Sequence, residues 1–132
     1  MAKRKKPVTA KAVPDVAPLH DLEGRLETEE GEPFTVEVWV VGDTPKWTVS
    51  LIGWSDQGDQ VRVAIGRDEP HLKKVVPAQP NGNYALSITA TLQAPGARFT
   101  LNASSESDEE RVDLVPIADK PVRMDALPVR VG

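Results

Sequence analysis

The sequence predicts an all-β fold, an antiparallel β-sandwich of about 7–9 strands that follows a disordered N-terminal arm. Apolar segments of about five to nine residues alternate with turns rich in the chain's 12 Pro and nine Gly, which suits short strands better than helices. From Glu32 onward apolar residues recur at every second position, the period of a strand with one buried face. With no Cys, the fold must be held by packing and hydrogen bonds alone.

The predicted arm comprises residues 1–18, and the remaining residues 19–132 are expected to form a single sandwich domain. The arm has five basic residues and one Asp, a net charge of +4, so the body carries −8 to give the whole-chain −4. It has no hydrophobic periodicity and too little apolar surface to offset chain entropy, so we expect disorder. Its clustered cations are candidate partner-binding residues: Lys3, Arg4, Lys5 and Lys6.

MAKRKK is similar to the positive start of a secretory signal, but the residues after it lack the apolar run of about 7–15 residues that such a signal needs. No segment approaches the roughly 20 apolar residues of a membrane helix. We therefore expect cytoplasmic synthesis without a signal peptide and no membrane contact. Association with a virion or another assembly is left open.

Residues 34–41, FTVEVWVV, predict a strand whose inward row begins with Phe34 and includes Val38. Trp39 falls on the opposite side, which Thr35 and Glu37 mark as solvent-facing. An outward Trp is either covered by another part of the chain or available to a partner. We expect cover by the arm around Val13 to Leu19 or by the C-terminal segment, and otherwise an interface.

Residues 46–54 and 61–65 predict a hairpin, because centring the loop SDQGD on Gln57 places the apolar residues of both segments on one face. The predicted register pairs Leu51 with Val63 and Trp54 with Gln60. Trp54 then points outward, and Arg62 lies diagonally across from it, where its guanidinium could stack on the indole.

Further strands are expected over Leu72 to Val76, YALSITATL, GARFTLNAS and RVDLVPI. PNGN predicts a hairpin between the first two, since Asn-Gly tolerates positive φ. HDLEGRLETEEG is ambiguous, because Leu19, Leu22 and Leu26 have helical spacing while Leu22 and Leu26 also share one face of a strand. Gly24 would weaken a helix, so an edge strand is favoured. Pro121 and Pro128 confine the final segment, PVRMDALPVRV, to an edge or to irregular structure.

EEGEPFTVEVWVVGDTPK resembles the second-strand region of intermediate-type immunoglobulin-like domains, and NYALSITATLQAPGARFTLNASS resembles their fifth and sixth strands. The resemblance implies an immunoglobulin-like sandwich without cysteines, in which Val38 and Leu101 replace the two residues that bridge the sheets. Phe99 takes the place of the family's corner Tyr. The resemblance also implies that 34–41 and 46–54 lie in opposite sheets, joined by an arch, although the local pattern fits a hairpin equally well.

The sequence predicts no catalytic residue, cofactor or metal site, and therefore no enzyme. His20 and His71 have no second ligand at metal-binding spacing, and no nucleophile motif is present. The acidic loops SDQGDQ and SSESDEE lack the spacing of a calcium loop.

The expected function is a structural or recognition module that docks on a larger protein assembly, such as a decoration or accessory protein of a phage particle. The candidate partner-binding residues are Trp39, Trp54, Arg62 and the four cations of the arm. The alternative is a carbohydrate-binding sandwich with Trp39 and Trp54 as a stacking platform. A homo-oligomer is left open, and nucleic acid is disfavoured by the acidic body.

Overall fold

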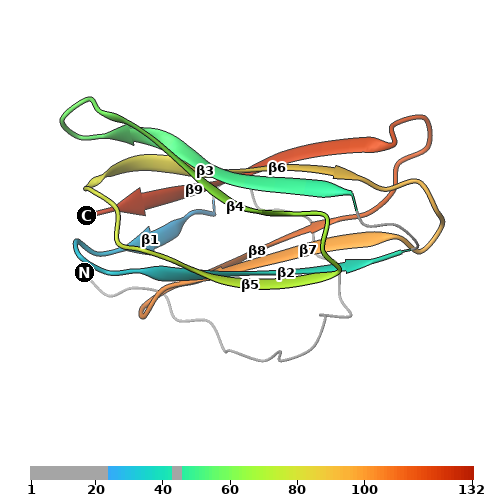
Figure 1. The fold of residues 1–132 in the computed structure, drawn as a ribbon, viewed down its shortest axis with the longest axis horizontal. Helices are drawn as coiled ribbons and strands as arrows, with labels where there is room; N and C mark the ends of the chain where they lie inside the picture. The colour runs from blue at the N-terminus through green and yellow to red at the C-terminus, as the bar shows by residue number, and fades with distance from the viewer. Residues whose placement is uncertain (1–23, 43–45) are drawn as a thin grey trace.

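A computed structural model describes residues 24–42 and 46–132, which form two packed layers of strands (Figure 1). All nine elements in this part of the chain are β-strands. They are β1 (Leu26–Thr28), β2 (Phe34–Val41), β3 (Trp47–Ser55), β4 (Gln60–Arg67), β5 (His71–Val76), β6 (Gly82–Thr91), β7 (Arg98–Ser104), β8 (Glu109–Leu114) and β9 (Val122–Val131). The prediction of an all-β sandwich is confirmed. The described chain contains no helix long and apolar enough to cross a membrane.

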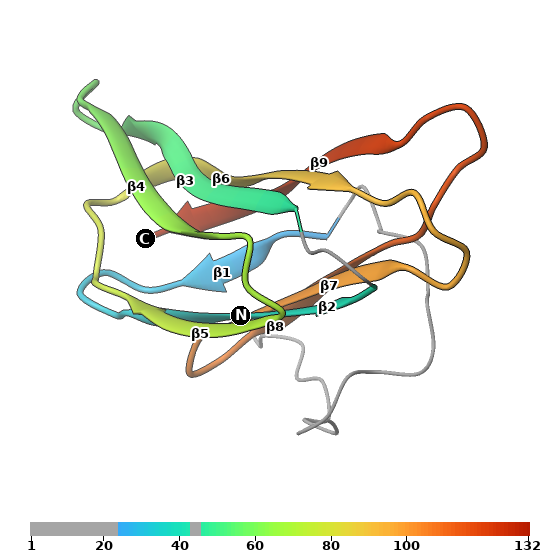
Figure 2. The ribbon, with the colours of Figure 1, turned by 45° about the vertical axis from the view of Figure 1, so that its right-hand side comes forward.

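The strands divide into a five-stranded sheet of order β1-β9-β6-β3-β4 and a four-stranded sheet of order β5-β2-β7-β8. Figure 2 shows the two sheets as separate layers. Neighbouring strands are antiparallel except β1 and β9, which run parallel. Each sheet therefore has one face on the core and one outer face.

The core is built from the inward rows that alternation predicts. The buried residues include Phe34, Val36, Val38, Trp47, Val49, Leu51, Tyr84, Leu86, Ile88, Ala90, Leu92, Phe99, Leu101 and Ala103. Trp47 packs edge-on against Phe99 with ring centroids 5.7 Å apart, and its Nε1–H donates to the Glu69 carbonyl at 2.7 Å. The buried indole thus has the polar partner that it needs.

The β3–β4 hairpin has the predicted register, with Leu51 opposite Val63 and Trp54 opposite Gln60. A bulge between Val49 and Ser50 shifts the pairing beyond that point. The arch is also confirmed, because β2 and β3 belong to different sheets.

The implied placement of Val38 and Leu101 in opposite sheets is wrong. They are direct cross-strand partners on β2 and β7 of the four-stranded sheet. In immunoglobulin domains the second and sixth strands lie in different sheets, so the strand order here departs from that arrangement. Alternation specifies which residues face inward, but either sheet can receive the same inward row.

The hairpin predicted at PNGN is also wrong, because β5 and β6 belong to different sheets. Gly82 is the first residue of β6, and a Cβ on it would lie 2.4 Å from the Trp54 carbonyl oxygen. This glycine therefore permits a close approach of β6 to β3, and it is not among the glycines with positive φ.

The two terminal strands agree in part with their predictions. β1 is an edge strand, as expected. β9 is a regular strand between β6 and β1, but β1 pairs only with Val129 to Val131, so residues 122–128 form the margin of the sheet. Pro128 stands at the end of that marginal stretch, which is where a strand tolerates proline.

Candidate functional site

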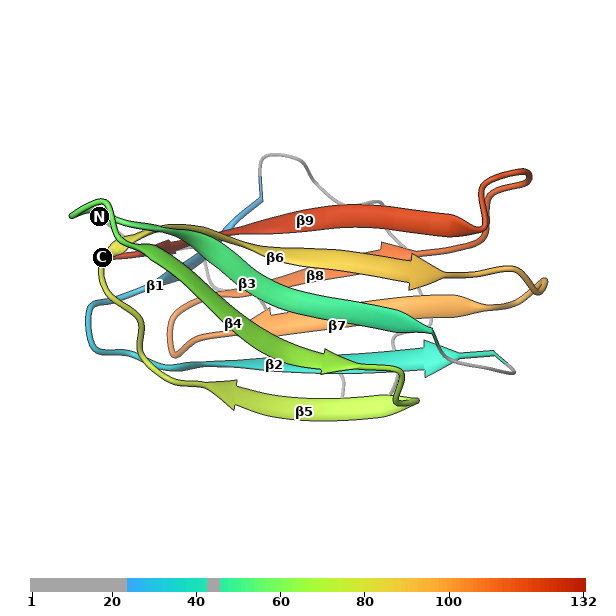
Figure 3. The same cartoon turned by 45° about the horizontal axis from the view of Figure 1, so that its top comes forward.

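The outer face of the five-stranded sheet has its charged residues at the ends of the strands and on the edge strands, where they are Glu27, Arg62, Arg67 and Arg130. Figure 3 shows β9, β6, β3 and β4 side by side across it. We call its central part the uncharged face. By strand alternation and register its outward residues are Thr48, Ser50, Ile52, Ala64, Ala85, Ser87, Thr89, Met124, Ala126 and Pro128.

The middle of the uncharged face is formed by small side chains. Ala64, Ser50, Ser87 and Ala126 lie opposite one another in register across four strands. Small residues let another backbone or sheet approach closely. The next row contains Ile52, Ala85 and Pro128, with Arg62 beside Ile52 on the edge strand β4.

Large apolar side chains stand at the two ends of this face. Trp54 is 59% exposed at one end, and Met124 and Val122 are 74% and 52% exposed at the other. Isolated exposed apolar residues are ordinary, so these side chains gain meaning only together with the uncharged centre between them.

The charges around the uncharged face are mostly neutralised within the chain. Arg67 lies 3.8 Å from Asp68, and Arg130 lies 3.1 Å from Asp56. Arg25, just before β1, pairs with Glu27 at 2.6 Å. Arg62, exposed on the marginal strand β4, has no ion pair among the described residues.

The outer face of the four-stranded sheet is charged by comparison. Trp39 points outward, as predicted, yet is only 8% exposed. Its ring centroid lies 5.8 Å from that of His71, and His71 Nε2 lies 2.7 Å from Glu37 Oε2. The C-terminal segment does not cover Trp39, because β9 belongs to the other sheet. The alternative cover, Val13 to Leu19, lies outside the described residues.

Asp113 is the centre of a polar cluster on this charged face. Its side chain is 1% exposed and accepts a 2.5 Å hydrogen bond from Thr100 Oγ1. Arg98 and Arg111 approach the two carboxylate oxygens at 3.3 Å and 3.6 Å. The cluster links β7 to β8 through these contacts and contains no histidine. Its geometry is that of a structural ion network.

The predicted site residues are not brought together. Trp54 and Trp39 lie on opposite outer faces of the sandwich, so they form no common stacking platform. Ring contacts among residues 24–42 and 46–132 join Trp39 with His71 and Trp47 with Phe99, and stacking of Arg62 on Trp54 is not among them. The four cations of the arm, Lys3, Arg4, Lys5 and Lys6, lie outside the described residues.

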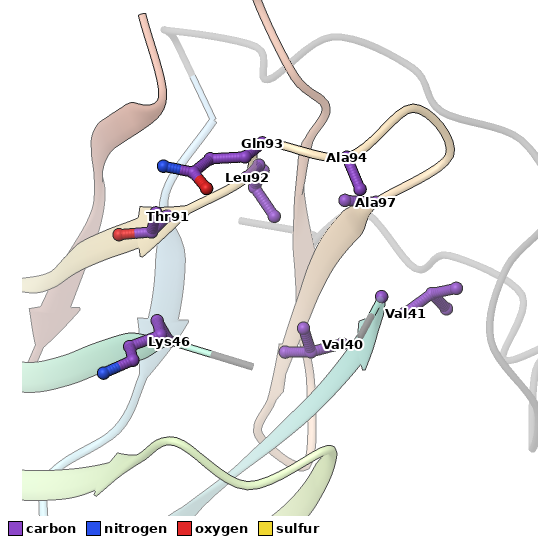
Figure 4. A pocket seen from close by; sticks show the side chains of 9 residues that line it. Val40, Val41, Lys46, Thr91, Leu92, Gln93, Ala94 and Ala97 are labelled. Carbon is purple, nitrogen blue, oxygen red and sulfur yellow. The ribbon is translucent and has the colours of Figure 1, made fainter. Parts of the chain in front are cut away.

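A cavity of about 400 Å³ opens at one end of the sandwich, where β2 and β6 end. Val40, Leu92, Ala94 and Ala97 form its apolar wall (Figure 4). Lys46 is the charged residue among the described lining. Thr91 and Gln93 add uncharged polar side chains to the described lining.

The acidic loops use their oxygens within the fold. The Ser55 hydroxyl accepts from the backbone N–H groups of Gln57 and Asp59, and Asp108 accepts from that of Glu27. The described residues contain no group of three or more potential metal ligands.

Tyr84 is the titratable group next to the Trp54 end of the uncharged face. Its hydroxyl donates to the Pro80 carbonyl at 2.7 Å. Burial raises the pKa of Tyr84 above its ordinary value, the charge of Asp56 raises it further, and Arg130 lowers it. The hydrogen bond with Asp56 in turn raises the pKa of Arg130.

Sequence reasoning considered single outward aromatics and missed the uncharged face as a surface. The signal was present, because the outward positions of YALSITATL are Ala, Ser and Thr. These positions can be recognised as part of one surface only when β6 is known to lie between β3 and β9.

Comparison with known proteins finds no matching family model, no matching curated protein and no matching solved structure. The class of the protein is therefore defined by its fold, a two-layer β-sandwich in which the centre of one outer face is uncharged.

Proposed function

We propose that this protein is a non-enzymatic structural or recognition module that docks on a larger protein assembly through the uncharged face. The observation that carries the proposal is the contrast between its two outer faces. In a chain with 27% charged residues, four adjacent strands expose Ala, Ser, Thr, Ile and Met at their centre.

The composition of the uncharged face supports docking on protein. Charged residues are depleted at the centre of protein interfaces, whereas Trp, Met and Arg are enriched. The face follows this pattern, with Trp54 and Met124 at its ends and Arg62 at its margin. A decoration or accessory role on a phage particle is one form of this function.

Sedimentation of the native assembly tests the proposal. A lysate of the native source is separated on a density gradient, and the tagged chain is followed through the fractions. We expect the wild-type chain to sediment with a high-mass assembly, and a Ser87→Arg variant, with a charge at the centre of the face, to remain near the top.

Thr35→Arg is the matched control, because Thr35 is an outward residue of a central strand on the other face. It should sediment like the wild type. A wild-type chain found only as a free small protein would contradict the proposal. An equal loss of co-sedimentation in Ser87→Arg and Thr35→Arg would also contradict it.

A further inference from the structure

The face that we assign to docking suggests a particular first partner. We propose that the uncharged face binds a second copy of this chain, so that the docking unit is a face-to-face dimer. This inference rests on the proposed function, because it names the partner of the same surface.

The electrostatics of the face favour a copy of itself. The whole chain carries −4, so two copies repel each other at most surfaces. Around the uncharged face, Arg67, Arg130 and Arg25 already have partners within the chain. A site for a strongly charged partner would instead present unpaired charge, and here Arg62 alone does so among the described residues.

The shape of the face also allows two copies to meet. Stacked sheets lie about 10 Å apart, which requires modest side chains at the centre of contact. Ser50 and Ser87 occupy that centre, flanked by Ala64 and Ala126. A two-fold axis near these residues would make the contact isologous, the commonest arrangement in soluble oligomers.

The size of the face is sufficient for a specific contact. Four strands spaced about 4.8 Å apart, each with about nine residues at about 3.3 Å, give a footprint on the order of 600 Å² per copy when the surrounding Arg62, Arg67 and Arg130 are included. Specific interfaces begin at about 1,200 Å² in total. We therefore expect a dimer at the weak end of specific association, with a dissociation constant in the micromolar range.

The measurement is sedimentation velocity of the purified full chain over a range of concentrations up to about 1 mM. The wild type should shift toward twice the mass of one chain as concentration rises. Ser87→Arg should weaken association at least about tenfold, whereas Thr35→Arg should associate like the wild type.

A thiol crosslink locates the contact, because the chain has no Cys of its own. Ser87→Cys treated with a short bismaleimide should give a covalent dimer, whereas Lys73→Cys, on the exposed charged face, should stay monomeric. Equal crosslinking of both variants would overturn the assignment of the face.

The two proposals fail in different ways. A wild type that stays monomeric at every concentration, while Ser87→Arg still loses co-sedimentation with the native assembly, overturns the dimer and leaves docking on another protein. A dimer through Ser87 with no high-mass assembly in the gradient supports the dimer and overturns the docking function.

Discussion

Gly53 lies directly opposite Tyr84 in the register between β3 and β6, and a Cβ on Gly53 would fall 2.3 Å from the Asn83 carbonyl oxygen and 2.6 Å from the Tyr84 Cα. Both neighbours are backbone atoms of an adjacent central strand, so they cannot move aside as a flexible side chain could. The contact sets how closely the two strands approach beneath the exposed Trp54.

We expect Gly53→Ala to destabilise the protein by about 1–3 kcal/mol, because the added methyl group overpacks two paired strands. Urea unfolding followed by tryptophan fluorescence measures the change. Ser50→Ala, an outward change on the same strand, should alter stability by no more than about 0.5 kcal/mol. A Gly53→Ala variant as stable as the wild type would show that the strands have room there.

The raised pKa of Tyr84 makes stability depend on alkaline pH. Folding favours the protonated phenol, so its burial contributes to the free energy of unfolding. This stabilisation is fully present below the unfolded-state pKa of about 10 and is lost as pH rises through the higher folded-state pKa. The chain has a single Tyr, so tyrosinate absorbance reports this group alone.

We expect the tyrosinate midpoint of the native protein to lie above that of the urea-unfolded chain. In addition, Tyr84→Phe should lose less stability than the wild type between about pH 9 and pH 11. Coincident native and unfolded midpoints would mean that the burial of the phenol has no energetic effect.

The Asp113 cluster should contribute to stability because its charge is buried between two guanidinium groups. Asp113→Asn is expected to lower the free energy of unfolding by about 1–3 kcal/mol. The neutral amide weakens the hydrogen bond with Thr100 and removes the ion pairs with Arg98 and Arg111. The matched control is Asp59→Asn, the same chemical change at an exposed turn. Equal midpoints for the two variants in chemical unfolding would refute a stabilising role.

Trp54 should account for most of the quencher-accessible fluorescence, since Trp39 and Trp47 are buried. In dilute solution, Trp54→Phe should leave emission that acrylamide quenches weakly. In the wild type, access to the quencher should fall as concentration rises if the uncharged face pairs with itself. Strong quenching of the Trp54→Phe variant would show that another indole is open to solvent.

The parts of the fold that were predictable from sequence are those governed by short loops. The β3–β4 pairing followed from placing Leu51 and Val63 on one face across a short turn, since a slip of one residue would expose the whole inward row. Burial of the inward residues followed from alternation for the same reason.

The long-range pairings were not predictable, because an inward row can join either sheet at equal burial. Local patterns therefore do not correct the resemblance, which implies different sheets for Val38 and Leu101, nor the hairpin that PNGN predicts. The contact of His71 with Glu37 also joins residues distant in sequence on β5 and β2, and no local spacing indicates it. Trp54 was identified as outward, but the surface around it depends on which strands lie beside β3.

The parallel pairing of β1 with β9 implies an order of assembly. Leu26 meets Val129 across about 100 intervening residues, so closing this loop is among the most entropically costly steps of folding. β1 has only three residues and its one strand neighbour is β9, which itself needs β6. The strand that comes first along the described chain should therefore be the last to join the sheet and the first to acquire deuterium in hydrogen exchange.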